Sequence, residues 1–378
     1  MMQEHRTMPE AAYELQQQAK RYNRAKYILA LVAFFIGLGY TLFMLFYGTF
    51  HLKRLALATF QVRWLMIAVY LLLFTTIYDL LTLPLSFYSG FILEKRFQLS
   101  TESLWAWIKK EVKKALLSFI LFLPLVELTY LFLDKLPGHW WFLAAGIWIL
   151  FTIIFAKLAP VLILPLFYKT SPLEDEALEK RLTHLAEGTG LKIENVERIE
   201  VSKETKKPNA ALVGSGRTRR ILLTDTLLKS FSGEEIAAVL AHELGHHILG
   251  HLWKFLVLGS VATIMGFSLA DYLLRMGVPH FGFQGLSDIA NFPLLLLVLI
   301  GFGLLLLPLQ NAISRRFEAR SDRYAINKTQ DPLVFISTME KLARLSLADR
   351  SPNRLIEFLF HDHPPIRERI KMAKEWQG

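Results

Sequence analysis

The sequence of 378 residues contains no cysteine. Disulfide frameworks and thiolate metal sites are therefore excluded, and any metal ion must be held by histidine, aspartate or glutamate. The first 26 residues are polar and lack the apolar stretch of a cleavable signal peptide, so we expect the first apolar segment to act as the insertion signal. No nucleic-acid-binding motif accompanies the formal net charge of +10, and we expect no nucleic-acid partner.

Apolar residues are abundant and fall in long blocks. They make up 53% of the chain. Six blocks are long enough to cross the roughly 30 Å hydrocarbon core of a bilayer. They are about Tyr27–Gly48, Val62–Tyr88, Ala115–Leu133, Trp141–Leu164, Phe255–Gly277 and Phe292–Ile313. We therefore predict an α-helical integral membrane protein of about six spans, with the lipid bilayer as a partner.

Basic residues gather on one side of the predicted spans. An even number of spans places both termini on the same side, and the loops of that side hold most of the lysines and arginines. These are Lys20, Arg21, Arg24 and Lys26 before the first span, and Lys95, Arg96, Lys109, Lys110, Lys113 and Lys114 after the second. The positive-inside rule then predicts that the termini and the segment 165–254 are cytoplasmic. Together with the lack of cysteine, this favours a prokaryotic cytoplasmic membrane.

The hydropathy pattern predicts five consecutive parts. They are a polar lead-in at 1–26, four spans within 27–164, an α+β unit at 165–254, two spans within 255–313 and a helical part at 314–378. In the α+β unit we expect a helix at Ser171–Gly190, strands at Val196–Ser202, Asn209–Gly214 and Arg219–Leu228, and a second helix after them. Ser232 and Glu235 have the spacing of a capping box that would begin this second helix.

The second helix contains "LAHELGHHILGH", in which His242, Glu243 and His246 form an HExxH motif. Positions i and i+4 share one face of a helix, so both imidazoles can bind one zinc ion. Glu243 can then face a zinc-bound water and accept its proton. Gly245 is expected to leave room for substrate or metal. We expect neither His247 nor His251 to be a ligand, and we place His251 at the membrane interface.

A catalytic zinc site needs a third protein ligand, and cysteine is absent. In "SRRFEARSDRYA", Glu318 and Asp322 lie four residues apart on an expected helix. Glu318 would complete a His2Glu set, and Asp322 would orient a ligating histidine. The alternative is a solvated helix face on which these carboxylates pair with neighbouring arginines. Spacing alone favours neither interpretation.

Two further segments carry candidate site residues. In "HDHPPIRER", His363 and Arg369 could stabilise an oxyanion, although the same residues are also typical of a capped helix start. Asn209 could open an edge strand that pairs with an extended peptide, or it could be a turn residue after Pro208.

These motifs, taken in order, resemble the membrane-embedded zinc metalloproteases of the type I CAAX prenyl endopeptidase family. The resemblance runs from about Leu83 to the C-terminus. It rests on "LPLSFY", "FILEKRFQLS", "NAALVG", "RRILLTDTLL", "EEIAAVLAHELGHHILGH", "SRRFEARSDRYA" and "HPPIRERI". HExxH by itself is common to many metalloproteases, whereas the ordered set is much more specific.

The resemblance implies specific roles for the site residues. It implies that His242, His246 and Glu318 bind one zinc ion, that Glu243 activates water and that Asp322 supports a ligand. It also implies that Asn209, His363 and Arg369 line the site, and that the spans enclose a water-filled chamber. The chain departs from the family pattern at two points. We count six spans where seven are common, and Ala211 stands where the family has an aromatic residue.

We therefore expect a membrane zinc endopeptidase with a zincin-like α+β unit and a peptide or protein substrate. The family suggests prenylated CAAX peptides in eukaryotes, whereas a prokaryotic source favours misfolded membrane proteins or peptides released from membranes. The alternative is a non-catalytic protein, a channel or holdase, that zinc stabilises. Structural zinc sites usually have four protein ligands, often cysteines, and neither feature is evident here.

Overall fold

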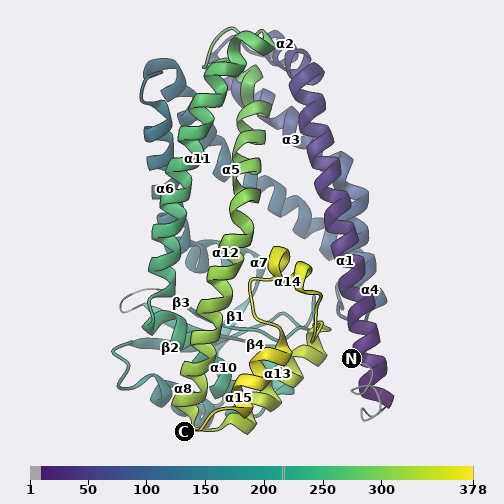
Figure 1. The fold of residues 1–378 in the computed structure, drawn as a ribbon, viewed down its shortest axis with the longest axis vertical. Coiled ribbons are helices and arrows are strands. Elements are labelled where there is room, and N and C mark those ends of the chain that lie inside the picture. Colours follow the sequence, from purple (N-terminus) through teal and green to yellow (C-terminus); the bar gives the residue numbers. More distant parts are fainter. Residues whose placement is uncertain (1–9, 215, 217, 378) are drawn as a thin grey trace.

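The computed structural model describes residues 10–214, 216 and 218–377, so residues 1–9 of the predicted lead-in lie outside it. Six helical segments of the described chain are long and apolar enough to cross a membrane. They are Tyr13–Thr59, Arg63–Arg96, Leu104–Lys135, Trp140–Phe167, His251–Phe281 and Ile289–Thr329. The predicted number of spans is thus confirmed. Figure 1 shows these helices running along the long axis, with the sheet and both ends of the described chain at one end.

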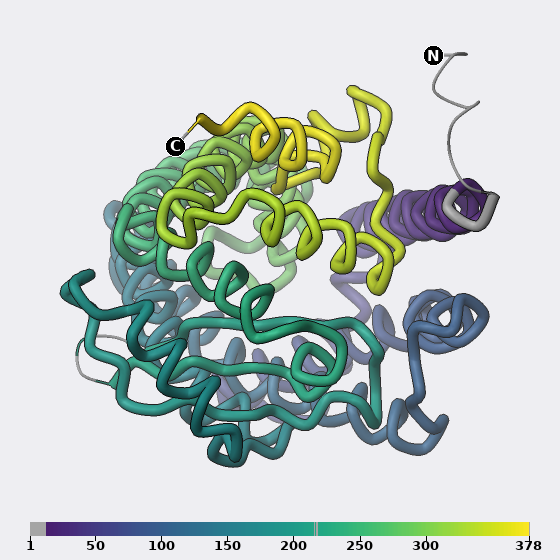
Figure 2. Tube along the Cα trace, turned by 90° about the horizontal axis from the view of Figure 1, so that it is seen from below, coloured from purple at the N-terminus to yellow at the C-terminus, as the bar shows by residue number. Residues whose placement is uncertain are grey.

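The helices that build the spans are interrupted by π-helical turns and bends. The first span joins α1 (Glu10–Phe43) to α2 (Thr49–Thr59), and the second joins α3 (Arg63–Phe87) to α4 (Leu93–Arg96). The remaining spans comprise α5 (Leu104–Lys135), α6 (Trp140–Leu158) with α7 (Leu164–Phe167), α11 (His251–Phe281) and α12 (Phe292–Thr329). The described part of the polar lead-in belongs to α1 and lies at the edge of the molecule when it is viewed from the sheet end (Figure 2).

Large aromatic residues are buried in a cluster where helices of the bundle pack against one another. Tyr70, Tyr130 and Trp140 are fully buried. Their polar atoms are satisfied within the bundle: Tyr130 Oη donates to Asn291 Oδ1 at 2.7 Å, and Tyr70 Oη lies 2.7 Å from Thr49 Oγ1. Such pairing is needed because an unpaired polar group has no water to bind in this environment.

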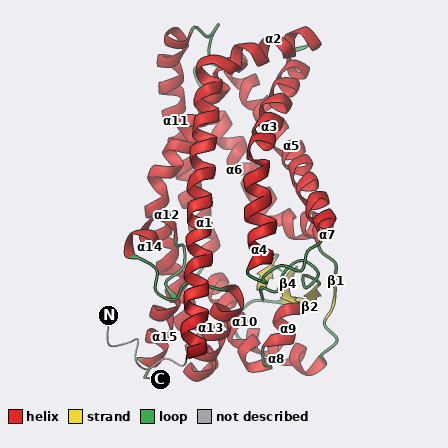
Figure 3. Ribbon diagram, turned by 90° about the vertical axis from the view of Figure 1, so that its right-hand side faces the viewer, coloured by secondary structure: helices red, strands yellow, loops and turns green. Residues whose placement is uncertain are grey.

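The α+β unit contains a four-stranded mixed sheet. Its strands are β1 (Thr170–Pro172), β2 (Ile193–Ile199), β3 (Ala210–Val213) and β4 (Arg219–Thr224), in the order β1-β2-β4-β3. Strands β2 and β4 are parallel, and the other two pairs are antiparallel. Its helices are α8 (Glu176–Ala186), α9 (Asp225–Ser230) and α10 (Gly233–Ile248), followed after α12 by α13 (Pro332–Ser346), α14 (Arg354–Phe360) and α15 (Ile366–Lys374). The strands lie together at one end of the molecule (Figure 3).

Two predicted strands have wrong boundaries, and side-chain hydrogen bonds explain where both strands end. β4 ends at Thr224 instead of Leu228, because the Thr224 side chain accepts a hydrogen bond from Leu227 N–H and so caps α9. β2 begins and ends earlier than predicted. The Asp225 carboxylate accepts hydrogen bonds from the N–H groups of Val201 and Ser202, which therefore leave the ladder. Side-chain acceptors of this kind compete with strand pairing.

Helix α10 begins as predicted and packs closely on α12. The Ser232–Glu235 capping box is present. Gly245 faces α12, where a Cβ atom at Gly245 would lie 3.1 Å from Ser321 Cα. The expectation that Gly245 makes room for substrate or metal is therefore wrong, because it makes room for the backbone of the neighbouring helix. This close approach brings α10 and Glu318 of α12 to one site.

Glu235 also joins α10 to α13. Its buried carboxylate accepts hydrogen bonds from Ser232 N, Ser337 Oγ and Lys341 Nζ at 2.9, 2.7 and 2.6 Å. Burial alone would raise the pKa of Glu235, but Lys341 and these hydrogen bonds lower it below its ordinary value. The charged form is therefore stabilised by the fold.

We predict that Glu235→Gln lowers the free energy of unfolding by about 2 kcal/mol, because hydrogen bonds to a buried charged group are lost. Thermal unfolding in detergent would measure the change. Glu234→Gln is the matched control, since the Glu234 side chain is 59% exposed. Because the folded pKa is lowered, the difference between wild type and Glu235→Gln should be complete above about pH 4.3 and shrink at lower pH. Equal loss in both variants would contradict the prediction.

Candidate metal centre

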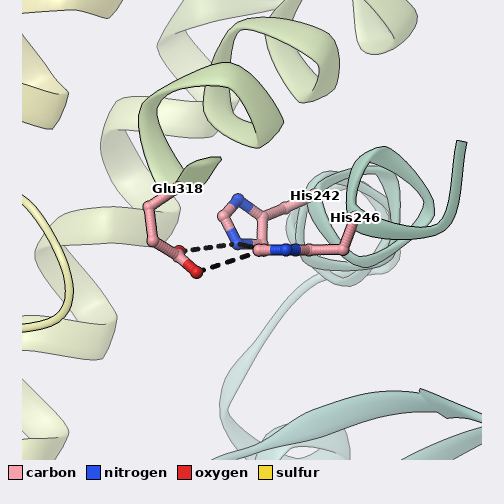
Figure 4. Close-up of side chains that lie close together, drawn as sticks. All are labelled: His242, His246 and Glu318. Carbon is pink, nitrogen blue, oxygen red and sulfur yellow. Dashed lines mark hydrogen bonds and ion pairs between the residues drawn. The ribbon is translucent and has the colours of Figure 1, made fainter. Parts of the chain in front are cut away.

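Three potential ligand atoms converge between α10 and α12 (Figure 4). His242 Nε2 lies 3.1 Å from His246 Nε2 and 3.2 Å from Glu318 Oε2, and His246 Nε2 lies 3.2 Å from Glu318 Oε1. Ligands about 2.0–2.1 Å from a tetrahedral zinc ion are about 3.3 Å from one another. The two Nε2 atoms and the two oxygens of the Glu318 carboxylate therefore lie at separations close to those between ligands of such a site. Among the described residues, this is the one His/Asp/Glu group with metal-site geometry.

The environment of these atoms favours a cation. Glu318 is buried, and its Oε2 atom has no hydrogen-bond partner of good geometry among the described residues. Burial would lower the pKa of His242, but Asp322 and Glu318 raise it to about 9. A pocket that stabilises a proton on a buried imidazole in this way also stabilises a metal cation, which competes with that proton for the imidazole.

Asp322 orients the first histidine. His242 Nδ1 lies 2.8 Å from Asp322 Oδ1, and Asp322 is 0% exposed. Arg369 donates to Asp322 through Nε at 2.8 Å and through Nη2 at 2.5 Å. The chain Arg369–Asp322–His242 places a proton on His242 Nδ1 and leaves the Nε2 lone pair directed at the shared point. Arg369, which we expected beside an oxyanion, is thus bound to Asp322, and its contact with substrate stays a prediction.

Glu243 lies beside the first histidine and is half-buried. No hydrogen bond or ion pair of its carboxylate is found among the described residues. Burial raises the pKa of Glu243, while His242, His246 and His363 oppose that rise. A carboxylate without a structural partner is free to accept a proton, and a raised pKa makes it a stronger base.

His363 reaches the same cluster from the loop before α15. Its Nε2 lies 3.2 Å from Glu318 Oε2, and its Nδ1 lies 2.8 Å from Asp362 Oδ1. The His363 side chain is 52% exposed, so it lies at the rim of the site. Its loop is held from two sides: Tyr27 Oη of α1 lies 2.8 Å from His361 Nε2, and Arg315 donates to the His361 carbonyl.

Asn209 directly precedes β3 and does not belong to the metal cluster. Its Oδ1 atom accepts from Ala210 N at 3.0 Å, and no contact with the three ligand residues is found in the described chain. β3 is an edge strand with β4 as its one neighbour. The hydrogen bond from Thr224 N to Asn209 O shows that the backbone groups of Asn209 face β4, so those of every second residue after it also face β4. Ala210 and Leu212 therefore direct their N–H and C=O groups away from β4. His247 Nε2 lies 3.0 Å from the Leu212 carbonyl oxygen.

His251, the first residue of the fifth span, has a burial and contacts that the sequence did not predict. It is 1% exposed, and its Nδ1 lies 3.2 Å from Nδ1 of His246. Gly250 has φ 66, a left-handed conformation that separates α10 from α11. The chain therefore turns between His247 and His251, and the helical spacing used to predict their directions does not apply. The glycine directly before His251 is the sequence feature that could have indicated this turn.

Comparisons with known proteins identify the family to which the chain is similar. Residues 172–377 match the model of peptidase family M48, and residues 1–169 match a model described as CAAX prenyl protease N-terminal, five membrane helices. The chain is 28% identical over 366 residues to the uncharacterized metalloprotease YhfN of Bacillus subtilis, which covers 94% of this chain and 85% of that protein. It is 31% identical over 317 residues to CAAX prenyl protease 1 of Saccharomyces cerevisiae, covering 79% and 70%.

A solved structure supports the same assignment. The crystal structure of S. mikatae Ste24p matches with a TM-score of 0.84 and 26% identity, covering 95% of this chain and 88% of that one. The family model covers more than half of the described chain and includes every residue of the metal cluster. The chain therefore belongs to peptidase family M48 and is an integral membrane metalloendopeptidase of the CAAX prenyl protease kind.

Proposed function

We propose that the metal of this endopeptidase is a single zinc ion held by His242, His246 and Glu318. The observation that carries the proposal is the spacing of 3.1–3.2 Å among the two imidazole Nε2 atoms and the Glu318 carboxylate oxygens, in a chain without cysteine. Two imidazoles and one carboxylate are a ligand set typical of catalytic zinc. When bound, zinc would supply Lewis acidity, polarising the scissile carbonyl and lowering the pKa of water to about 7.

Glu243 is the proposed general base. Its carboxylate would take a proton from the attacking water, and the same proton would pass to the nitrogen of the leaving amine as the C–N bond breaks. The lack of a structural partner supports this role, because neither transfer requires breaking an existing ion pair. A free carboxylate beside three ligands also argues against a purely structural zinc site, which would use a fourth protein ligand.

His363 would contact the reacting groups directly, whereas Arg369 would act through other side chains. His363 lies at the rim with Nε2 close to Glu318, where an imidazole N–H could donate to the developing oxyanion. Asp362 holds Nδ1 and raises the pKa of His363, so the protonated donor is favoured. Arg369 would act through Asp322 and His242, as a positioning residue.

The substrate would lie extended along β3. The outward-facing C=O of Ala210 and N–H of Leu212 could pair with a peptide, with Asn209 at the start of the strand. We propose that the spans enclose a water-filled chamber through which peptides reach the site. Since the similarity to the Bacillus subtilis protein extends over most of the chain, we favour misfolded membrane proteins or membrane-released peptides over prenylated CAAX peptides.

We propose that the site faces the cytoplasm of a prokaryote. The sheet, helix α10 and both described chain ends lie at one end of the bundle (Figure 1). Basic residues of the first and third spans pair with acidic residues near that end, as Lys26 does with Glu94 and Lys110 with Glu204. The positive-inside rule places that end in the cytoplasm.

Glu243→Gln should separate zinc binding from cleavage. We expect cleavage of a fluorogenic peptide mixture to fall at least about 100-fold, because the general base is lost, while one zinc per chain is retained. Glu318→Gln is the matched comparison and should lose zinc as well as activity. Bound zinc would be quantified by atomic absorption in both variants. Full activity of Glu243→Gln with zinc bound would disprove the catalytic assignment.

Arg369→Lys should weaken zinc binding although it keeps the charge. A lysine cannot make the two parallel hydrogen bonds to Asp322, so His242 would be held less firmly. We expect an affinity loss on the order of 10-fold, measured by competition with a chelator. Lys371→Arg, on the same helix and 73% exposed, is the control. An unchanged affinity would mean that Arg369 does not act through Asp322.

Asn209→Ala should impair substrate use without affecting the metal. Loss of one hydrogen bond to the peptide should reduce kcat/KM by about 10-fold, while zinc content stays at the wild-type level. Steady-state kinetics with a defined cleaved peptide would measure it. Thr189→Ala, at a part-buried turn of the same unit, would control for general destabilisation. A loss of zinc in Asn209→Ala would point to a structural role instead.

A further inference from the structure

We propose that His251 is a positioning residue that fixes the tautomer and orientation of the second histidine ligand, His246. The inference rests on the proposed zinc site and concerns a residue outside the HExxH motif. Nδ1 of His251 lies 3.2 Å from Nδ1 of His246, and the two rings meet nearly at right angles, with an interplanar angle of 78°. His246 Nε2 is the atom that faces the metal cluster. The ring of His246 therefore lies between the cluster and His251.

One proton is shared by this pair of nitrogens, and its location decides whether His246 can bind a metal. If His246 carries the proton on Nδ1, its Nε2 lone pair is free, and Nδ1–H donates to the His251 Nδ1 lone pair. If His251 carries the proton on Nδ1, that N–H donates to Nδ1 of His246. His246 then carries its own proton on Nε2, and this proton blocks metal binding. Metal binding thus requires that His251 present an unprotonated Nδ1 to its neighbour.

The His251 ring is itself held rigidly. It stacks on Phe317, with ring centroids 4.3 Å apart and an interplanar angle of 4°, and Ser321 Oγ lies 3.4 Å from its Nδ1. Phe317 directly precedes the ligand Glu318 in α12. The same contacts that fix His251 therefore belong to the helix that supplies the third ligand, so the second and third ligands are positioned together.

The other nitrogen of His251 indicates that this arrangement does not serve stability. Its Nε2 atom is buried and has no hydrogen-bond partner among the described residues. In the tautomer required above, Nε2 carries a proton, so the fold leaves an N–H unpaired. A phenylalanine would stack on Phe317 equally well without that penalty. An imidazole at this position is therefore explained by the acceptor that it offers to His246.

The two histidine ligands thus have unlike partners. His242 donates to the carboxylate of Asp322, whereas His246 donates to a neutral imidazole. A carboxylate partner makes the ligating imidazole a stronger electron donor than a neutral partner does. The neutral partner also keeps the negative charge around the metal lower, which leaves the metal a stronger Lewis acid.

The experiment compares zinc affinity in the purified full-length chain, wild type against His251→Asn and His251→Phe. The amide oxygen of asparagine can take the place of Nδ1 as an acceptor, whereas phenylalanine keeps the stack but offers no acceptor. We expect His251→Phe to weaken zinc affinity on the order of 10- to 100-fold and His251→Asn to stay within about 3-fold of wild type. His247→Asn is the matched control, since the His247 side chain contacts the Leu212 carbonyl and, among the described residues, makes no side-chain hydrogen bond or ion pair with His242, His246 or Glu318.

Affinity would be measured by competition with a chromogenic chelator, and the visible spectrum of the Co²⁺-substituted protein would report ligand geometry. We expect the His251→Phe spectrum to differ from wild type and the His251→Asn spectrum to match it. His251→Leu, which also lacks an acceptor, would replace the phenylalanine variant if that variant does not fold. Wild-type zinc affinity in the folded variant without an acceptor would overturn the proposal, as would equal loss in the asparagine variant.

Failure of this inference is distinguishable from failure of the proposed function. A wild-type chain that binds no zinc would overturn the zinc assignment itself, and the inference with it. A wild-type chain that binds one zinc ion and cleaves peptides, together with an unaffected His251→Phe variant, would overturn the role of His251 alone.

Discussion

The close approach of α10 to α12 is the constraint on which the rest of the site depends. Gly245 has no side chain, and Ser321 is small, so the two helix backbones come into contact between the ligand residues. Glu318 can then lie within 3.2 Å of both histidines of α10. A side chain at position 245 would push α12 away, and a metal site cannot stretch to follow because its bond lengths are fixed to within about 0.2 Å.

Each buried carboxylate around the proposed metal position is paired with basic side chains. Asp322 is fully buried yet is bound by Arg369 on one side and His242 on the other. Glu318 faces three imidazoles. Removing one partner of such a pair leaves an uncompensated buried charge, which destabilises the fold far more than the loss of a surface ion pair does. The arrangement therefore needs the C-terminal helix α15, distant in sequence, to complete a site begun at α10.

Local spacing allowed much of this to be predicted, and long-range packing explains what was missed. HExxH places His242 and His246 on one helical face, and the i,i+4 spacing of Glu318 and Asp322 indicated that both could point one way. Spacing left a solvated face equally open for those carboxylates, because nothing local shows which helix lies opposite. The role of Gly245 depends on which helix packs against it, and the capping of α9 depends on the side chain of Thr224. The position of His251 depends on the left-handed backbone conformation of Gly250. The spacing of apolar residues along the chain predicts neither packing partners nor single backbone conformations.

The short edge strand β3 has a consequence for behaviour in a crowded bilayer. An unpaired strand edge can template pairing with another chain, which leads to association of copies. β3 is only four residues long, and His247 already occupies one of its outward carbonyls, at Leu212. Too few free backbone groups remain to join two sheets stably. The edge thus resists permanent sheet-to-sheet aggregation between neighbouring molecules, and the peptide pairing proposed for it would be transient.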